Sequence, residues 1–157
     1  MYPHPFALLI RLLLSLGGVA FAIGFPLVYG YKQSYSRYFE DDSLVFCSVL
    51  FLLAVGLFMH KNKKWTIPSG SLMLVASFDM FSMPIVHYSA AFVFFLFSSL
   101  AMLGDKRING FGKVSFLLYP LLFWDLIFFE LFQVLIICLF HIVYIIKTFF
   151  LMRRKNS

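Results

Sequence analysis

Residues 114–152 read VSFLLYPLLFWDLIFFELFQVLIICLFHIVYIIKTFFLM, an almost unbroken apolar tract. As one α-helix it would extend about 58 Å, roughly twice the thickness of the hydrocarbon core of a bilayer. Two spans of acceptable length result if the chain folds back between Asp125 and Glu130. No Gly, Pro or Asn lies between these two acids, so charge alone marks the turn. One long helix remains the alternative.

The composition of the whole chain indicates that its solvent is lipid. Of 157 residues, 62% are hydrophobic, 22 are Phe, and 13% are charged. Typical soluble domains are nearer half apolar and a quarter charged, and a domain this small could not hide so much apolar surface from water. The sequence therefore predicts an all-α integral membrane protein with a single domain over residues 1–157.

Six transmembrane spans are predicted from the apolar segments. A membrane helix needs roughly 20 mostly apolar residues, and shorter segments are tolerated at some cost. The small residues Gly17, Gly18 and Gly24, together with Pro26, predict a first span that bends or packs closely. Its apolar core is longer than that of a cleaved signal peptide, so we expect it in the mature protein. The predicted spans are approximately residues 8–30, 43–60, 69–83, 87–103, 113–127 and 129–152.

Basic residues gather on one side of this six-span arrangement. Only Lys32 and Arg37, of thirteen Lys and Arg residues, fall on the other side. Because cytoplasmic segments are enriched in Lys and Arg, we predict that both termini are cytoplasmic. A five-span arrangement would place Arg11 outside and leave one helix far too long. The residues on the terminal side are Arg11, Lys61, Lys63, Lys64, Lys106, Arg107, Lys113, Lys147, Arg153, Arg154 and Lys155.

The net charge of +6 does not indicate a nucleic-acid partner. The basic residues of the chain fall in short clusters between apolar runs, as expected for loops beside an anionic leaflet. No solvated domain is left to carry a nucleic-acid surface. The two cysteines, Cys47 and Cys138, lie inside apolar runs and are interpreted as packing residues rather than a disulfide.

A polar pocket at the outer membrane face is the main site predicted. Ionisable residues inside a membrane are costly and usually face the protein interior or a water-filled cavity. In the six-span arrangement, the first outer loop and the two other outer turns bring polar side chains to the same side. The residues predicted for this pocket are Arg37, Tyr38, Asp79, His87, Asp125 and Glu130.

Two interpretations of this pocket stay open. In the functional one, Arg37 binds a phosphate, while Asp79, His87 and Glu130 pair, relay protons or hold a metal. In the other, these residues cap helix ends, pair with each other or lie in interfacial water. Zinc needs three or four convergent donors, and the spacing of Asp79 and His87 matches no compact ligand motif. No metal and no cofactor are therefore predicted.

Two further histidines lie in or beside the apolar segments. His141 falls near the middle of the sixth predicted span, where it could relay protons or, as a neutral imidazole, form a hydrogen bond between helices. His60 ends the second predicted span beside lysines and is expected at the interface. Neither a phosphate-binding glycine motif nor a G-x-S-x-G motif accompanies them.

Three short features resemble a known group of membrane proteins. Residues 34–39 read SYSRYF, residues 87–95 read HYSAAFVFF, and Glu130 opens the sixth predicted span. In these features and in layout the chain resembles small six-helix bacterial membrane proteins of unknown function, which are similar to the DRAM/Frag/Sfk group. The bacterial relatives usually carry two adjacent tyrosines where this chain has Arg37 and Tyr38. Eukaryotic members are linked to lipid anchor remodelling, lipid asymmetry and autophagy, so the resemblance implies a lipid-related role.

Three functions are consistent with these observations. We expect a non-enzymatic or accessory protein of the bacterial inner membrane that binds lipid, or a partner's helices, through its outer polar face. The first alternative is a small oligomeric transporter or channel lined by Asp79, Glu130 or His141, although no internal repeat is present. The second is a membrane-embedded lipid-modifying enzyme that uses Asp79, His87 and Glu130. The expected partners are membrane lipids, a second copy of the chain or another membrane protein.

Overall fold

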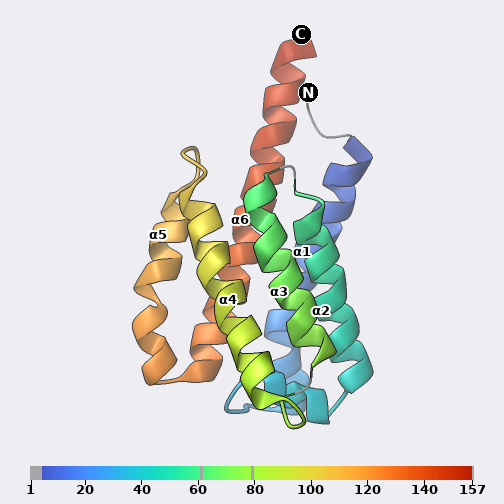
Figure 1. Cartoon of the computed structure of the whole chain (residues 1–157). Helices are drawn as coiled ribbons and strands as arrows, with labels where there is room; N and C mark the ends of the chain where they lie inside the picture. The colour runs from blue at the N-terminus through green and yellow to red at the C-terminus, as the bar shows by residue number, and fades with distance from the viewer. Residues whose placement is uncertain (1–4, 61, 79, 157) are drawn as a thin grey trace.

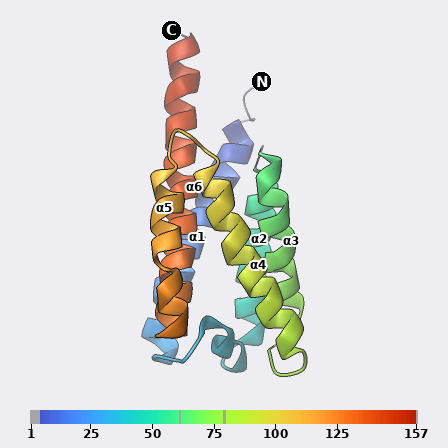
Figure 2. The same cartoon turned by 60° about the vertical axis from the view of Figure 1, so that its left-hand side comes forward.

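The computed structural model describes residues 5–60, 62–78 and 80–156, and it contains no strand within them. This confirms the predicted all-α class. Successive helices run antiparallel, and α1 begins at the same end of the bundle at which α6 finishes (Figure 1 and Figure 2). The α-helices are α1 (Pro5–Tyr29), α2 (Ser43–Phe58), α3 (Thr66–Ser77), α4 (Pro84–Leu103), α5 (Gly110–Leu117) and α6 (Leu126–Asn156), and the 3-10 helices are η1 (Tyr35–Glu40), η2 (Lys63–Trp65) and η3 (Tyr119–Phe123).

Three of these helices are long and apolar enough to cross a membrane. They are α1, α4 and the part of α6 over Leu126–Arg154. Helix α2 and the segment Gly110–Phe123 are apolar but shorter. Large apolar side chains such as those of Leu27, Ile85 and Phe123 are exposed on the outside of the bundle, which is expected where the surrounding solvent is lipid. The chain is therefore a membrane protein.

The final apolar tract is two helical segments rather than one rod. Helix α5 ends at Leu117, the chain turns through η3, and α6 begins at Leu126. The break thus starts earlier than the segment from Asp125 to Glu130 in which the sequence placed it. Pro120 explains the difference, because proline has no amide hydrogen for a helix and disfavours helical backbone in the residue before it.

Helix α3 begins and ends at different residues from those predicted, whereas α4 begins earlier than predicted and ends at the predicted Leu103. Helix α3 covers Thr66–Ser77, whereas the sequence predicted residues 69–83. It ends because Phe78 adopts an extended backbone, and α4 then begins directly at Pro84. Proline fits the first helical position, where its missing amide hydrogen has no partner to lose. At about 1.5 Å per residue, α3 is only about 18 Å long.

Helix α1 presents one closely packed face to the bundle. A Cβ atom added at Gly18 would lie 2.6 Å from Cys138 Sγ and 2.9 Å from Leu53 Cδ2, whereas Gly17 and Gly24 have open space beside them. Small residues allow helices to approach each other closely in membranes. Gly18 therefore marks the face of α1 that packs against α2 and α6.

A buried polar network joins α4, α5 and α6. The Ser115 hydroxyl donates to Gln133 Oε1 at 2.6 Å, and Gln133 Nε2 donates to the Ser115 carbonyl at 2.9 Å. The Ser99 and Ser115 hydroxyls lie 2.5 Å apart, and all three side chains are fully buried. Because hydrogen bonds between helices stabilise membrane bundles, this network holds α5 against both of its neighbours.

Candidate functional site

Helix η1 and the starts of α4 and α6 lie at the end of the bundle away from the termini (Figure 1). His87 is buried there and links three segments. Its Nδ1 lies 2.7 Å from the Phe78 carbonyl and its Nε2 lies 2.6 Å from the Ser36 hydroxyl. A carbonyl can only accept, so Nδ1 carries a proton, and in the neutral imidazole Nε2 accepts the hydroxyl proton of Ser36. Both nitrogens of His87 are therefore hydrogen-bonded.

Arg37 and Tyr38 lie on η1, and their side chains differ in burial. Tyr38 is fully buried, and its hydroxyl donates to the Gly30 carbonyl at 2.8 Å. Arg37 is half-buried, and its backbone amide bonds to the Ser34 carbonyl at 3.2 Å. Asp79, the other residue predicted beside His87, lies outside the described residues.

The two acids of the last outer turn lie in different surroundings. The Asp125 carboxylate accepts a hydrogen bond from the Phe128 amide at 3.3 Å and so caps the start of α6. It also lines a surface hollow with Tyr31 and Lys32. Glu130, by contrast, is buried and lines an interior cavity together with Ser36. The structure thus brings Glu130 to the same region as Ser36 and His87, while Asp125 caps a helix.

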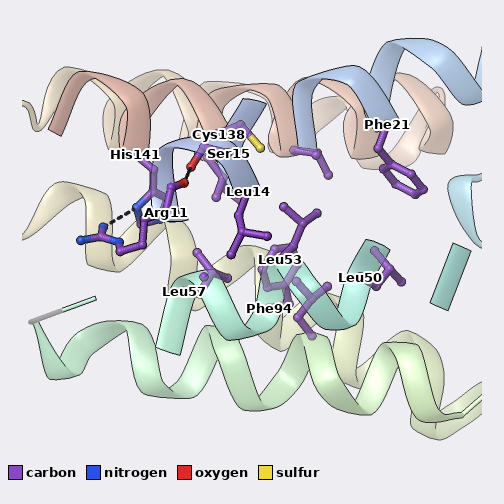
Figure 3. A pocket seen from close by; sticks show the side chains of 14 residues that line it. Arg11, Leu14, Ser15, Phe21, Leu50, Leu53, Leu57, Phe94, Cys138 and His141 are labelled. Atoms are coloured by element: carbon purple, nitrogen blue, oxygen red, sulfur yellow. Dashed lines mark hydrogen bonds between the residues drawn. The ribbon is translucent and has the colours of Figure 1, made fainter. Parts of the chain in front are cut away.

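A second polar group lies toward the end of the bundle where the termini are, and the sequence did not predict it as a unit. Arg11 of α1, His60 after α2 and His141 of α6, hereafter the basic cluster, are 3%, 7% and 3% exposed. Arg11 Nη2 lies 3.2 Å from His141 Nδ1 (Figure 3). The rings of His60 and His141 have centroids 5.3 Å apart. Trp65 and Tyr144 enclose the group, with centroids 4.3 Å from His141 and 4.6 Å from His60 respectively.

The hydrogen bonds of the basic cluster define the protonation of both imidazoles. A guanidinium has no acceptor, so Arg11 donates to His141 Nδ1. His60 Nδ1 accepts from the Asn62 amide at 3.0 Å. Each imidazole is therefore neutral and carries its proton on Nε2. Within the described part of the chain, neither Nε2 nor Arg11 Nε has a hydrogen-bond partner.

The buried charge of Arg11 is poorly compensated. Moving such a cation out of water costs several kcal/mol unless an anion faces it. Its guanidinium carbon lies 5.4 Å from the ring centroid of Tyr144, and a cation–π contact recovers only about 1–2 kcal/mol. Among the described residues no carboxylate forms an ion pair with it. Asp105 interacts electrostatically with His60, but its carboxylate is bonded to Arg107 instead, with Nη2 of Arg107 3.1 Å from Oδ2.

The basic cluster adjoins an apolar cavity between α1, α2 and α6. Arg11, Ser15 and His141 lie at one end of this cavity, and its other walls are almost entirely apolar (Figure 3). It encloses about 40 Å³, room for roughly three water molecules, but cavities with apolar walls stay dry. Such a space is suited to hydrocarbon rather than to a polar solute.

A second cavity of about 40 Å³ extends this space toward η1. Glu130 and Ser36 line it, and so do several residues of the first cavity. The bundle therefore has a row of loosely packed space along its interior, with the basic cluster at one end and Glu130 near the other. The residues that line both cavities are Phe21, Leu50, Leu72, Phe94 and Val134.

Sequence reasoning assigned each member of the basic cluster a separate place. Arg11 was counted as a cytoplasmic charge, His60 was expected at the interface, and His141 was a lone intramembrane candidate. His60 is instead buried. One signal was available for Arg11, which lies inside an apolar run, with Ser15 and Gly18 on the same helix face. A charge on a face of small residues points into the bundle.

The described residues hold no group of three or more His, Cys, Asp or Glu side chains that could bind a metal ion. Comparison of the whole chain with models of protein families, with curated proteins and with solved structures finds no match. The interpretation of the site therefore depends on its own geometry and chemistry.

Proposed function

We propose that this protein binds a membrane lipid inside its helix bundle. The observation that carries the proposal is the apolar cavity that ends on the buried Arg11, whose charge has no ion-pair partner among the described residues. Amphiphiles combine the two chemistries that this site offers, an apolar chain and a polar head. The enclosed space accepts only a short length of chain, so the remainder of the lipid would lie along the apolar outer surface. The resemblance to the DRAM/Frag/Sfk group points toward the same lipid-related role.

The proposal includes a six-span arrangement in a bacterial inner membrane, with both termini on its cytoplasmic side. Its support is the antiparallel order of six helices, with the start of α1 and the finish of α6 at one end (Figure 2). In the sequence, eleven of the thirteen basic residues belong to the segments predicted for that side. Helices as short as α3 require the bilayer to thin locally around the bundle, which costs only fractions of a kcal/mol per Å.

Mass spectrometry of the intact protein in mild detergent tests lipid binding. Val134 lines both cavities, so Val134→Phe fills the space that the chain would enter. Leu139→Phe is the matched control, because this side chain is 45% exposed on the same helix. We expect bound lipid on the wild type and on the control, and its loss from Val134→Phe. Equal lipid on the two variants, when both elute as folded protein, would contradict the proposal.

A second candidate function is acyl transfer at the opposite end of the bundle. Ser36 donates to His87 Nε2, while His87 Nδ1 is oriented by the Phe78 carbonyl. This is the relation of nucleophile, base and orienting group in serine-type catalysis. In such a reaction the Ser36 oxygen would attack an ester carbonyl, and His87 would pass the hydroxyl proton to the departing alcohol. A serine-reactive phosphonate that labels the wild type but not Ser36→Ala would favour this function, and an unlabelled wild type would remove it.

A further inference from the structure

We infer that the basic cluster binds the oxyanion of a phosphate group. The inference rests on the proposed lipid binding in one respect, since it identifies the lipid headgroup as the source of the phosphate. The same chemistry would also bind free inorganic phosphate. The binding site consists of Arg11, His60 and His141, whose side chains come from three separate segments of the chain.

Three unused hydrogen-bond donors carry this inference. The protons on Arg11 Nε, His60 Nε2 and His141 Nε2 have no partner among the described residues, and all three side chains are more than nine-tenths buried. Both imidazoles already accept at Nδ1, so Nε2 can only donate. Buried donors are normally satisfied. Three such donors in one neighbourhood call for an acceptor with several oxygens.

The surroundings of the basic cluster favour an anion over a neutral acceptor. Arg11 is positive, and a second guanidinium, that of Arg107, lies 5.2 Å from the ring centroid of Tyr144. Asp105 is the acid nearest in the chain to Arg107, and both of its oxygens already bond to that residue. The aromatic faces of Trp65 and Tyr144 are weak acceptors by comparison. A bound anion would therefore supply the negative charge that the cluster lacks.

Phosphate fits these donors better than carboxylate does. The donors come from three side chains rather than from a single guanidinium fork. A phosphodiester carries two non-bridging and two ester oxygens in a tetrahedral arrangement, whereas a carboxylate presents two oxygens in one plane. Arg11 also lies six residues inside α1, about 9 Å along the helix from Pro5. That depth is near the headgroups of the leaflet on the terminal side, with the apolar cavity directly beyond it.

The test uses the full-length protein in mild detergent and in lipid nanodiscs. Phosphatidylglycerol, phosphatidylcholine and inorganic phosphate serve as probes, and retained lipid and the shift in melting temperature are measured. Arg11→Gln removes the charge and the Nε donor, and Lys113→Gln, which removes a charge from an exposed side chain outside the basic cluster, is the control. Arg11→Lys keeps the charge without the Nε donor, so a partial effect is expected.

We expect the wild type and Lys113→Gln to prefer phosphatidylglycerol, and Arg11→Gln to bind it about tenfold more weakly or worse, as the loss of a charged hydrogen bond predicts. His60→Gln and His141→Gln should each weaken it by about threefold to tenfold. An Arg11→Gln protein that binds phosphatidylglycerol as tightly as the wild type while folded would overturn the inference. Retained lipid in Arg11→Gln but not in Val134→Phe would overturn it while leaving the proposed lipid binding intact.

The phosphate arm separates the two sources. A stabilisation by inorganic phosphate alone that Arg11→Gln abolishes supports the anion site. If no lipid is retained by the same wild-type protein, the proposed lipid binding fails and the ligand is a soluble phosphate. If neither phosphate nor phosphatidylglycerol stabilises the wild type, the basic cluster is not an anion site.

Discussion

A cross-link between positions 115 and 133 tests the reversal of the final apolar tract, on which the bundle depends. In an unbroken helix these residues would lie about 27 Å apart. In the structure, Ser115 Oγ and Gln133 Oε1 are separated by 2.6 Å. We therefore expect Ser115→Cys with Gln133→Cys, made after replacement of Cys47 and Cys138 by Ala, to be joined within one chain by a short bifunctional thiol reagent.

The cross-link is read in native membranes as a faster band on a non-reducing gel and as the mass of one bridge per chain. Ser115→Cys with Leu139→Cys is the control pair, because Leu139 points outward from α6. Ser99→Cys with Ser115→Cys provides a positive control. The two serine hydroxyls lie 2.5 Å apart, so the cysteines that replace them should oxidise directly to a disulfide. A cross-linked positive control without any 115–133 product would refute the packing of α5 against α6.

The polar network also has an energetic consequence that the same pair of helices should reveal. Gln133→Leu removes two hydrogen bonds between α5 and α6. At about 0.6 kcal/mol for each bond in a membrane bundle, the loss is about 1 kcal/mol. For a chain of this size, that corresponds to a fall in melting temperature of about 2–4 °C in detergent. A stability equal to that of the wild type would show that the network does not hold these helices together.

Three further changes should alter stability in ways that thermal unfolding in detergent measures. Gly112→Ala should lower the free energy of unfolding by about 1–3 kcal/mol, because the new Cβ would lie 2.5 Å from the Leu103 amide nitrogen. Gly110→Ala is the control, because it has open space and should cost nothing. Equal effects would refute this reasoning. Partial burial raises the pKa of Asp105, but hydrogen bonds from its neighbouring arginine outweigh burial and leave the pKa below its ordinary value. The stability that this carboxylate contributes is present above the unfolded pKa of about 4 and is lost as pH falls through the lower folded pKa. Asp105→Asn should therefore make the melting temperature less sensitive to acid. An unchanged acid sensitivity would contradict this prediction. His87→Ala should cost about 1–3 kcal/mol because it leaves two buried groups without their partner; a neutral result would mean that the bridge is not structural.

Much of the fold could be predicted from the sequence because lipid imposes simple rules. Composition alone identifies the solvent, and the length of an apolar run limits how far one helix can extend. A turn in the final tract was favoured for that reason, and the structure has one. The position of the turn was predicted less well, because charge indicated Asp125 to Glu130 whereas Pro120 ends the helical backbone earlier. The boundaries of α3 were missed for a similar reason, since an apolar composition continues through Phe78 although the backbone there is extended.

The predicted outer pocket was inferred from the positions of its residues relative to the turns. Turn positions correctly indicated that His87 and η1 would lie at one end of the bundle, because consecutive antiparallel helices must place alternate turns together. The sequence could not distinguish the roles of the two acids beside the last turn. Asp125 caps a helix, while Glu130 faces the interior. The two acids lie about one turn apart near the start of α6, and the rotation of α6 about its own axis determines which of them faces the interior.

The sequence by itself determined that this chain is a helical membrane protein, and the length of its last tract favoured a reversal there. Those properties follow from transfer energies and helix length, which are local. Only the tertiary structure decided which apolar faces turn inward, because helices that are apolar on all sides carry no periodic signal of their packing. Arg11 and His141 are 130 positions apart, and their meeting at the end of a shared cavity is a consequence of how α1 packs against α6.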